Sequence, residues 1–159
     1  MRYLLIFLLL VSCVAIADPP ADYPFVGYDA GLQQAQEQKK HIFVYFGRHG
    51  CGFCAKTNKE SFSDPGLKKR YIENYILVYV DAESGNRLTL PTGERITESE
   101  LGAQLNVFAT PIFMYLDMNG EVLFRAPGYK TVKDFVHFDQ YIQQGHYKTK
   151  SINEFISKQ

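Results

Sequence analysis

The residues of this sequence best suited to chemistry are two cysteines three positions apart, in Cys51-Gly52-Phe53-Cys54. They follow an apolar run at 42–46 and a break at 47–50, where we expect a helix to begin. Residues i and i+3 share a helix face with α-carbons roughly 5 Å apart, which a disulfide tolerates. The partial positive charge of a helix N-terminus favours a thiolate, the attacking species in disulfide exchange. We therefore expect Cys51 to attack a disulfide and Cys54 to resolve the mixed disulfide.

Two other roles of the cysteine pair have weaker support. A structural bridge is common in exported proteins, but a bridge across so short a loop restricts the unfolded chain little. Half of a zinc site would need further ligands, and the four histidines form no recognisable ligand pair. We therefore expect redox chemistry of the dithiol itself, with no metal and no cofactor.

Length and charge give no sign of a second domain or of a nucleic-acid partner. The 159 residues fit one ordinary domain, and 46% of them are hydrophobic, as in a protein with a real core. The 17 basic and 17 acidic side chains balance. That balance gives no electrostatic reason to expect a nucleic-acid partner.

The N-terminus has the pattern of an export signal. A positive start is followed by an apolar run at 3–16 that is too short for a comfortable membrane span and that ends at Asp18-Pro19-Pro20. We interpret residues 1–17 as a signal peptide cleaved after Ala17. Leu10-Val11-Ser12-Cys13 also resembles a lipobox, in which case the signal is 1–12 and Cys13 is lipidated. Either route predicts a periplasmic protein, soluble or lipid-anchored.

The remaining chain alternates strand and helix signals. The proline-rich segment 18–28 predicts an extended leader, followed by a domain at 29–159. Short apolar runs predict strands at 42–46, 76–80, 112–116 and 122–124, the last two joined by an Asn119-Gly120 hairpin. Capping signals predict helices that begin at Asp29, Asp64, Thr97 and Ser151. Two more helices are expected, one from Cys51 and one from about Thr131. Residues 83–95 predict a loop with room for a small hairpin.

In this order, the strand ending at the cysteines, the Thr110-Pro111 step, the Asn119-Gly120 hairpin and Gly128 resemble the thioredoxin superfamily over roughly 29–144. The resemblance implies an α/β, thioredoxin-like three-layer fold, with a central mixed β-sheet flanked by helices. It also implies that Pro111 is cis and packs beside the dithiol, and that the backbone at Thr110 pairs with an incoming peptide.

The finer likeness is to exported bacterial thioredoxin-like proteins of the SoxW type. It rests on the layout of the loop and helix before Thr110 and on the segment TPIFMYLDMNGEVLFRAPGY. Phe53 is expected to border an apolar substrate groove. Phe108 is expected either to border the same groove or to pack in the core.

The sequence departs from the superfamily pattern at two positions. Gly50 stands where cytosolic thioredoxins have a tryptophan, and Tyr45 stands where they have a buried acid that assists proton transfer at the second cysteine. Proton transfer is then expected through water, Glu60 or Asp81. Arg48 and His49 could add positive potential beside Cys51 and so tune the thiolate.

We therefore interpret the chain as an exported thiol–disulfide oxidoreductase that reduces protein disulfides. In an oxidising compartment it would need electrons from a membrane thiol donor. Its expected partners are that donor and disulfide-containing protein substrates, and we expect it to be a monomer. The alternatives are a disulfide isomerase and a non-catalytic peptide-binding module of thioredoxin fold.

Overall fold

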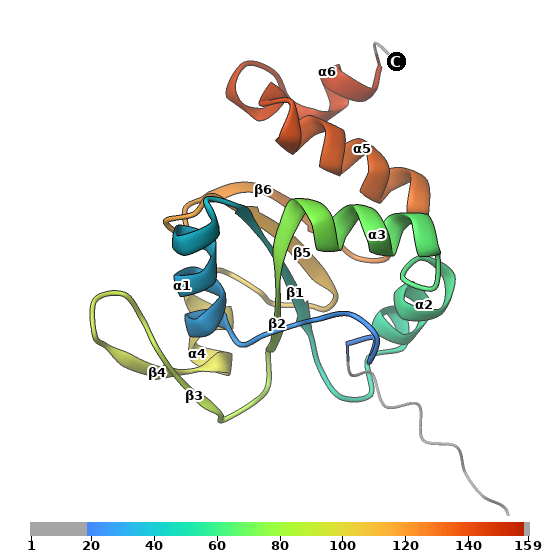
Figure 1. The fold of residues 1–159 in the computed structure, drawn as a ribbon. Coiled ribbons are helices and arrows are strands. Elements are labelled where there is room, and N and C mark those ends of the chain that lie inside the picture. Colours follow the sequence, from blue (N-terminus) through green and yellow to red (C-terminus); the bar gives the residue numbers. More distant parts are fainter. Residues whose placement is uncertain (1–18, 158–159) are drawn as a thin grey trace, which may run out of the picture.

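A four-stranded mixed sheet lies at the centre of the molecule (Figure 1). The computed structural model describes residues 19–157, so the predicted signal peptide and Cys13 lie outside the described residues. The strands follow the order β2-β1-β5-β6 and span Tyr75–Asp81, His41–Gly47, Ile112–Leu116 and Val122–Pro127. β1 runs parallel to β2 and antiparallel to β5, and β6 returns antiparallel to β5. The four predicted strands are confirmed, with β6 longer than expected.

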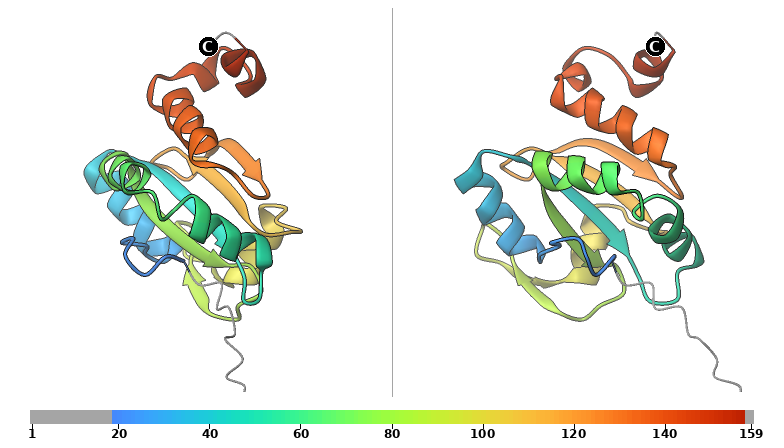
Figure 2. Two further views of the ribbon diagram at one scale, coloured as in Figure 1. Left: turned by 90° about the vertical axis from the view of Figure 1, so that its right-hand side faces the viewer. Right: turned by 45° about the vertical axis from the view of Figure 1, so that its right-hand side comes forward.

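Helices cover both faces of this sheet, which confirms the predicted three-layer arrangement (Figure 2). One face packs against α1 (Tyr28–Gln38) and α4 (Glu98–Gln104), and the other against α2 (Gly52–Glu60), α3 (Pro65–Asn74) and α5 (Val132–Gln143). Side chains of β1 alternate between the two layers: Phe43 and Tyr45 enter one core, and Val44 and Phe46 enter the other. A central strand buried on both faces is therefore apolar at nearly every position.

Most predicted helix starts are confirmed by their caps. Asp64 accepts a hydrogen bond from the Leu67 amide at 2.7 Å, with a proline at the start of α3. Reciprocal capping boxes open α4 at Thr97, α5 at Thr131 and the short α6 (Ile152–Ile156) at Ser151. These boxes satisfy amide groups that a helix N-terminus leaves unpaired.

The prediction that Asp29 caps the first helix is wrong. The N-cap of α1 is Gly27, which makes no side-chain cap, and Asp29 lies in the first turn. An acidic side chain in that turn is still favourable, because it faces the positive end of the helix dipole.

Two segments add to the central layers. The predicted leader 18–28, from residue 19 onward, packs on the domain: the Val26 amide donates to the Leu77 carbonyl at 2.9 Å, and Tyr23 is buried against Phe62. The predicted loop at 83–95 contains part of an antiparallel hairpin, β3 (Arg87–Thr89) and β4 (Arg95–Thr97). After α5, a 3-10 turn (His146–Lys148) leads to α6, which lies on the side of α5 away from the sheet (Figure 2).

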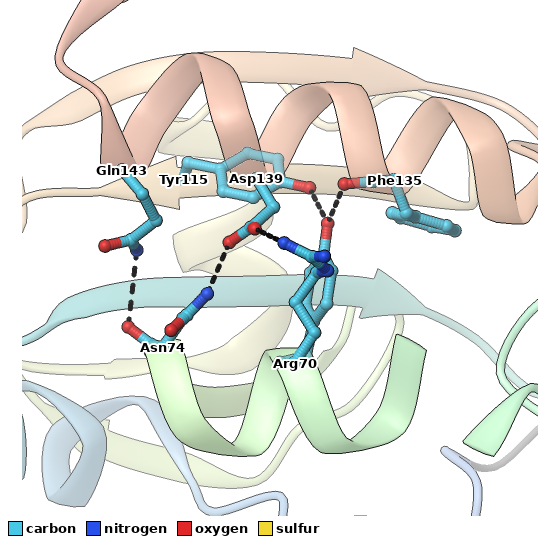
Figure 3. A network of polar contacts seen from close by, with 7 residues as sticks. Arg70, Asn74, Tyr115, Phe135, Asp139 and Gln143 are labelled. Carbon is cyan, nitrogen blue, oxygen red and sulfur yellow. Dashed lines mark hydrogen bonds and ion pairs between the residues drawn. The ribbon is translucent and has the colours of Figure 1, made fainter. Parts of the chain in front are cut away.

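A buried polar network joins α3 to α5 (Figure 3). Asp139 on α5 is only 2% exposed, and its carboxylate accepts hydrogen bonds from Arg70 at 2.7 Å and Asn74 at 2.9 Å. Close by, the Tyr71 hydroxyl donates to the Phe135 carbonyl at 2.8 Å. A carboxylate this deeply buried is stabilising only while its donors remain in place.

We predict that Asp139→Asn lowers the free energy of unfolding by about 1–3 kcal/mol, because a neutral amide replaces an acceptor of two hydrogen bonds, one of them from a cation. Urea unfolding at neutral pH measures this. Glu73→Gln is the control, since it removes only an exposed 3.9 Å ion pair with Lys69 and should cost less than about 0.5 kcal/mol. Equal free energies of unfolding for the two variants would show that the hydrogen bonds of Asp139 do not stabilise the fold.

Candidate active site

The two cysteines lie where β1 gives way to α2. They form a disulfide with a Cα–Cα distance of 5.2 Å. Cys51 is the N-cap of α2, and its sulfur accepts a hydrogen bond from the Cys54 amide at 3.1 Å. In the reduced protein, the same amide and the helix dipole would stabilise a thiolate at Cys51. The predicted placement of the pair at a helix N-terminus is confirmed.

The two sulfur-bearing residues differ in access to solvent. Cys51 is 5% exposed and lies between the exposed residues Gly50, Gly52 and Phe53, whereas Cys54 is 0% exposed within the core. Cys51 therefore lies just beneath exposed residues, nearer to an incoming disulfide than Cys54, which is positioned to act from inside.

The Thr110–Pro111 turn lies at the same end of the sheet. Ile112 pairs with Phe46 near the end of β1, which places Pro111 beside the segment that leads to Cys51. The Thr110–Pro111 bond is cis, as predicted, and the Pro111 carbonyl accepts a hydrogen bond from the Gly128 amide at 2.8 Å. The Thr110 hydroxyl oxygen is buried and has no hydrogen-bond partner within residues 19–157. The turn therefore carries a buried polar atom without a partner next to the dithiol region.

A hollow of about 310 Å³ borders this turn. Its lining comes from the loops that follow β1, β2 and α4, and consists of Arg48, Ala82, Glu83, Val107, Phe108, Ala109 and Thr110. Phe108 is 85% exposed, so it borders the hollow rather than packing in the core. Phe53, at 64% exposure, presents a second aromatic ring next to Cys51 but does not line this hollow.

The two residues predicted to tune the thiolate are both exposed. Arg48 pairs with Glu83, with 3.1 Å between guanidinium nitrogen and carboxylate oxygen, so its charge is partly neutralised at the rim of the hollow. His49 makes no hydrogen bond to either cysteine in the described structure. Their tuning role stays a prediction.

The structure narrows the routes for proton transfer. Tyr45 is fully buried and donates to the Asn58 side-chain oxygen at 3.2 Å, and burial raises the pKa of Tyr45 well above its ordinary value. Tyr45 therefore stays protonated near neutral pH and cannot replace the missing acid as a base. Glu60 accepts a hydrogen bond from Tyr129, and Asp81 accepts one from the Glu83 amide, so each predicted carboxylate has another partner.

Three residues of this region were not identified from the sequence. Asn58 lies four residues after Cys54, and that helical spacing could have indicated it. Glu83 and Tyr129 carry no local signal, because they reach the site from distant loops.

Among the described residues, no group of three histidine, cysteine or acidic side chains could hold a metal ion, and no helix is long and apolar enough to cross a membrane.

Comparison with known proteins places this geometry in context. A family model described as a thioredoxin-like domain matches residues 28–143. A relative from Archaeoglobus fulgidus, described as an uncharacterized protein, is 45% identical over 56 residues, which is 35% of this chain and 43% of that protein. The chain thus matches less than half the length of that relative.

Solved structures share the fold at low sequence identity. A thioredoxin-fold protein from Helicobacter pylori superimposes with a TM-score of 0.65 at 22% identity, over 76% of this chain and 80% of the other. A thioredoxin from Thermus thermophilus gives 0.62 at 22% identity, over 76% and 87% of the two chains. A putative disulphide-isomerase from Bacteroides thetaiotaomicron gives 0.61 at 21% identity, over 84% and 98%. At these identities the likeness shows the fold alone.

Proposed function

The chain belongs to the thioredoxin-like domain family and carries the Cys51–Cys54 pair of a thiol–disulfide oxidoreductase, and from this premise we propose that it reduces protein disulfides outside the cytoplasm. The observation that carries the proposal is the position of Cys51. Its sulfur caps a helix N-terminus, and the residue keeps a small exposure of 5% between exposed neighbours, while its partner Cys54 is fully buried. A purely structural bridge would have no need for this asymmetry.

The proposed reaction begins with the reduced dithiol. The Cys51 thiolate attacks one sulfur of a substrate disulfide and forms a mixed disulfide, and the other substrate sulfur leaves as a thiolate that takes up a proton. Cys54 then loses its proton and attacks the Cys51 sulfur. The second substrate sulfur leaves as a thiol, and the enzyme holds the Cys51–Cys54 disulfide. Two electrons and two protons have passed to the substrate.

The substrate would lie along the Thr110–Pro111 turn. An extended peptide can pair with the backbone at Thr110, and the neighbouring hollow with Phe108 at its edge can take a side chain of that peptide. Phe53 offers apolar surface on the other side of Cys51. These features support a polypeptide rather than a small molecule as the natural substrate.

The direction of the reaction and its location rest on the sequence. An export signal at 1–17 would deliver the protein to an oxidising compartment, where a membrane thiol donor would have to return the dithiol to its reduced form. The layout of the loop and helix before Thr110 resembles exported thioredoxin-like proteins of the SoxW type, which agrees with such a location.

Reduction of insulin disulfides by dithiothreitol tests the activity directly. We expect the wild-type protein to accelerate the reaction and Cys51→Ser to return it to the uncatalysed rate, because the attacking sulfur is gone. Cys54→Ala is the matched variant: it should still form the mixed disulfide and accumulate it with substrate. Full activity of Cys51→Ser would defeat the assignment. Renaturation of scrambled ribonuclease without consumption of reductant would assign an isomerase instead.

Export is tested by the mass of the mature protein after expression of the full chain in a bacterium with two membranes. We expect a periplasmic chain that begins at Asp18, or a lipid-modified chain that begins at Cys13. A Cys13→Ser variant separates the two, since it abolishes lipidation and leaves cleavage after Ala17 unaffected. A cytoplasmic protein that retains the apolar segment would contradict export.

A further inference from the structure

The loop between β6 and α5, residues 128–130, contacts both halves of the candidate active site. At one end, the Gly128 amide donates to the carbonyl of Pro111 at 2.8 Å. Gly128 has a φ of 76°, a conformation that favours glycine at this turn. The loop is therefore fastened directly to the residue that follows Thr110.

At its other end, the loop holds the second half of α2 and the residue that follows it. The Tyr129 hydroxyl donates to the Glu60 carboxylate at 2.7 Å, and the Lys56 ammonium lies 4.4 Å from the centre of the Tyr129 ring. The Ser61 hydroxyl, on a fully buried residue, donates to the Lys130 carbonyl at 2.6 Å. Three separate contacts thus join one short loop to the helix that begins at Cys51.

These contacts add to the hydrogen bond between Tyr45 on β1 and Asn58 on α2, at 3.2 Å. Within this helix only Cys54 and Thr57 are buried, and Cys54 belongs to the reacting pair. The loop itself is stiffened by Lys130, whose ammonium donates to the carbonyls of Pro127 and Tyr129. Hydrogen bonding to Glu60 raises the pKa of Tyr129, so its hydroxyl remains a donor at neutral pH.

We propose that Tyr129, with Glu60 and Lys56, is a positioning residue that fixes the separation between the dithiol helix and the Thr110–Pro111 turn. The inference rests on the proposed function, since it concerns how a peptide held at the turn is aligned with Cys51. It makes a specific distinction between substrates. A polypeptide must contact the turn and the sulfur together, whereas a small disulfide needs only the sulfur. Loss of the contacts that Tyr129 makes with Glu60 and Lys56 therefore impairs reduction of a polypeptide disulfide and spares reduction of a small disulfide.

Tyr129→Phe tests this by removing a single hydroxyl. We expect the KM for fluorescently labelled insulin to rise about 3- to 10-fold, as for the loss of one exposed hydrogen bond of ordinary strength. The rate with Ellman's reagent, a small disulfide attacked by Cys51, should change less than about 2-fold. Glu60→Gln, which keeps an acceptor oxygen, should retain more of the insulin activity than Glu60→Ala. Tyr141→Phe is the control, because its hydroxyl bonds to the Lys150 carbonyl at 2.7 Å near the C-terminus.

Amide hydrogen exchange of α2 provides a readout that does not need turnover. Tyr129→Phe should speed exchange at residues 55–61, and Tyr141→Phe should leave it unchanged. An unaltered KM for insulin, an equal loss of activity with both substrates, or unaltered exchange of α2 would each overturn the positioning role of Tyr129. If the wild-type protein fails to reduce insulin, the proposed function is wrong. The exchange result alone then decides whether Tyr129 restrains α2.

Discussion

The hydrogen bond from the Cys54 amide to the Cys51 sulfur links the chemistry of the dithiol to the position of a helix start. It exists because Cys51 is the N-cap of α2, where the first amides of a helix have no partner within the helix. The unpaired amides and the positive end of the dipole therefore act on Cys51, the less deeply buried of the two cysteines. Strand, break and helix start must therefore fall at these positions for the dithiol to be reactive.

An aromatic core supports the dithiol from below. Phe43 on β1, Phe113 on β5 and Phe135 on α5 pack with ring centroids 4.9–6.2 Å apart, and the same cluster contains both cysteines. Burial of such large rings contributes much of the packing free energy of a domain this size. At the position where cytosolic thioredoxins have a buried acid, this core has Tyr45, which stays protonated near neutral pH. Deprotonation of Cys54 must therefore differ from that in cytosolic thioredoxins.

Local signals explain what the sequence could predict, and distant contacts explain what it could not. Apolar runs, capping residues and the cysteine spacing act within a few residues of one another, so the strands, the boxed helices and the cysteine pair followed from them. The cis bond at Pro111 was predicted only from the resemblance to the thioredoxin superfamily. The prediction that Asp29 is a cap was wrong because an aspartate near a helix start is favourable both at the N-cap and in the first turn. The pairings of Arg48 with Glu83 and of Glu60 with Tyr129 span 35 and 69 residues, and only the folded chain brings them together.

The ionisation of the Cys51 sulfur can be measured by the pH dependence of its alkylation. The reduced protein is treated with iodoacetamide across a pH series, and the modified cysteine is identified by peptide mass. We predict that Cys51 alone reacts, with a pKa well below the value of about 8.5 for a free cysteine. A pKa near that value, or equal modification of Cys54, would contradict it.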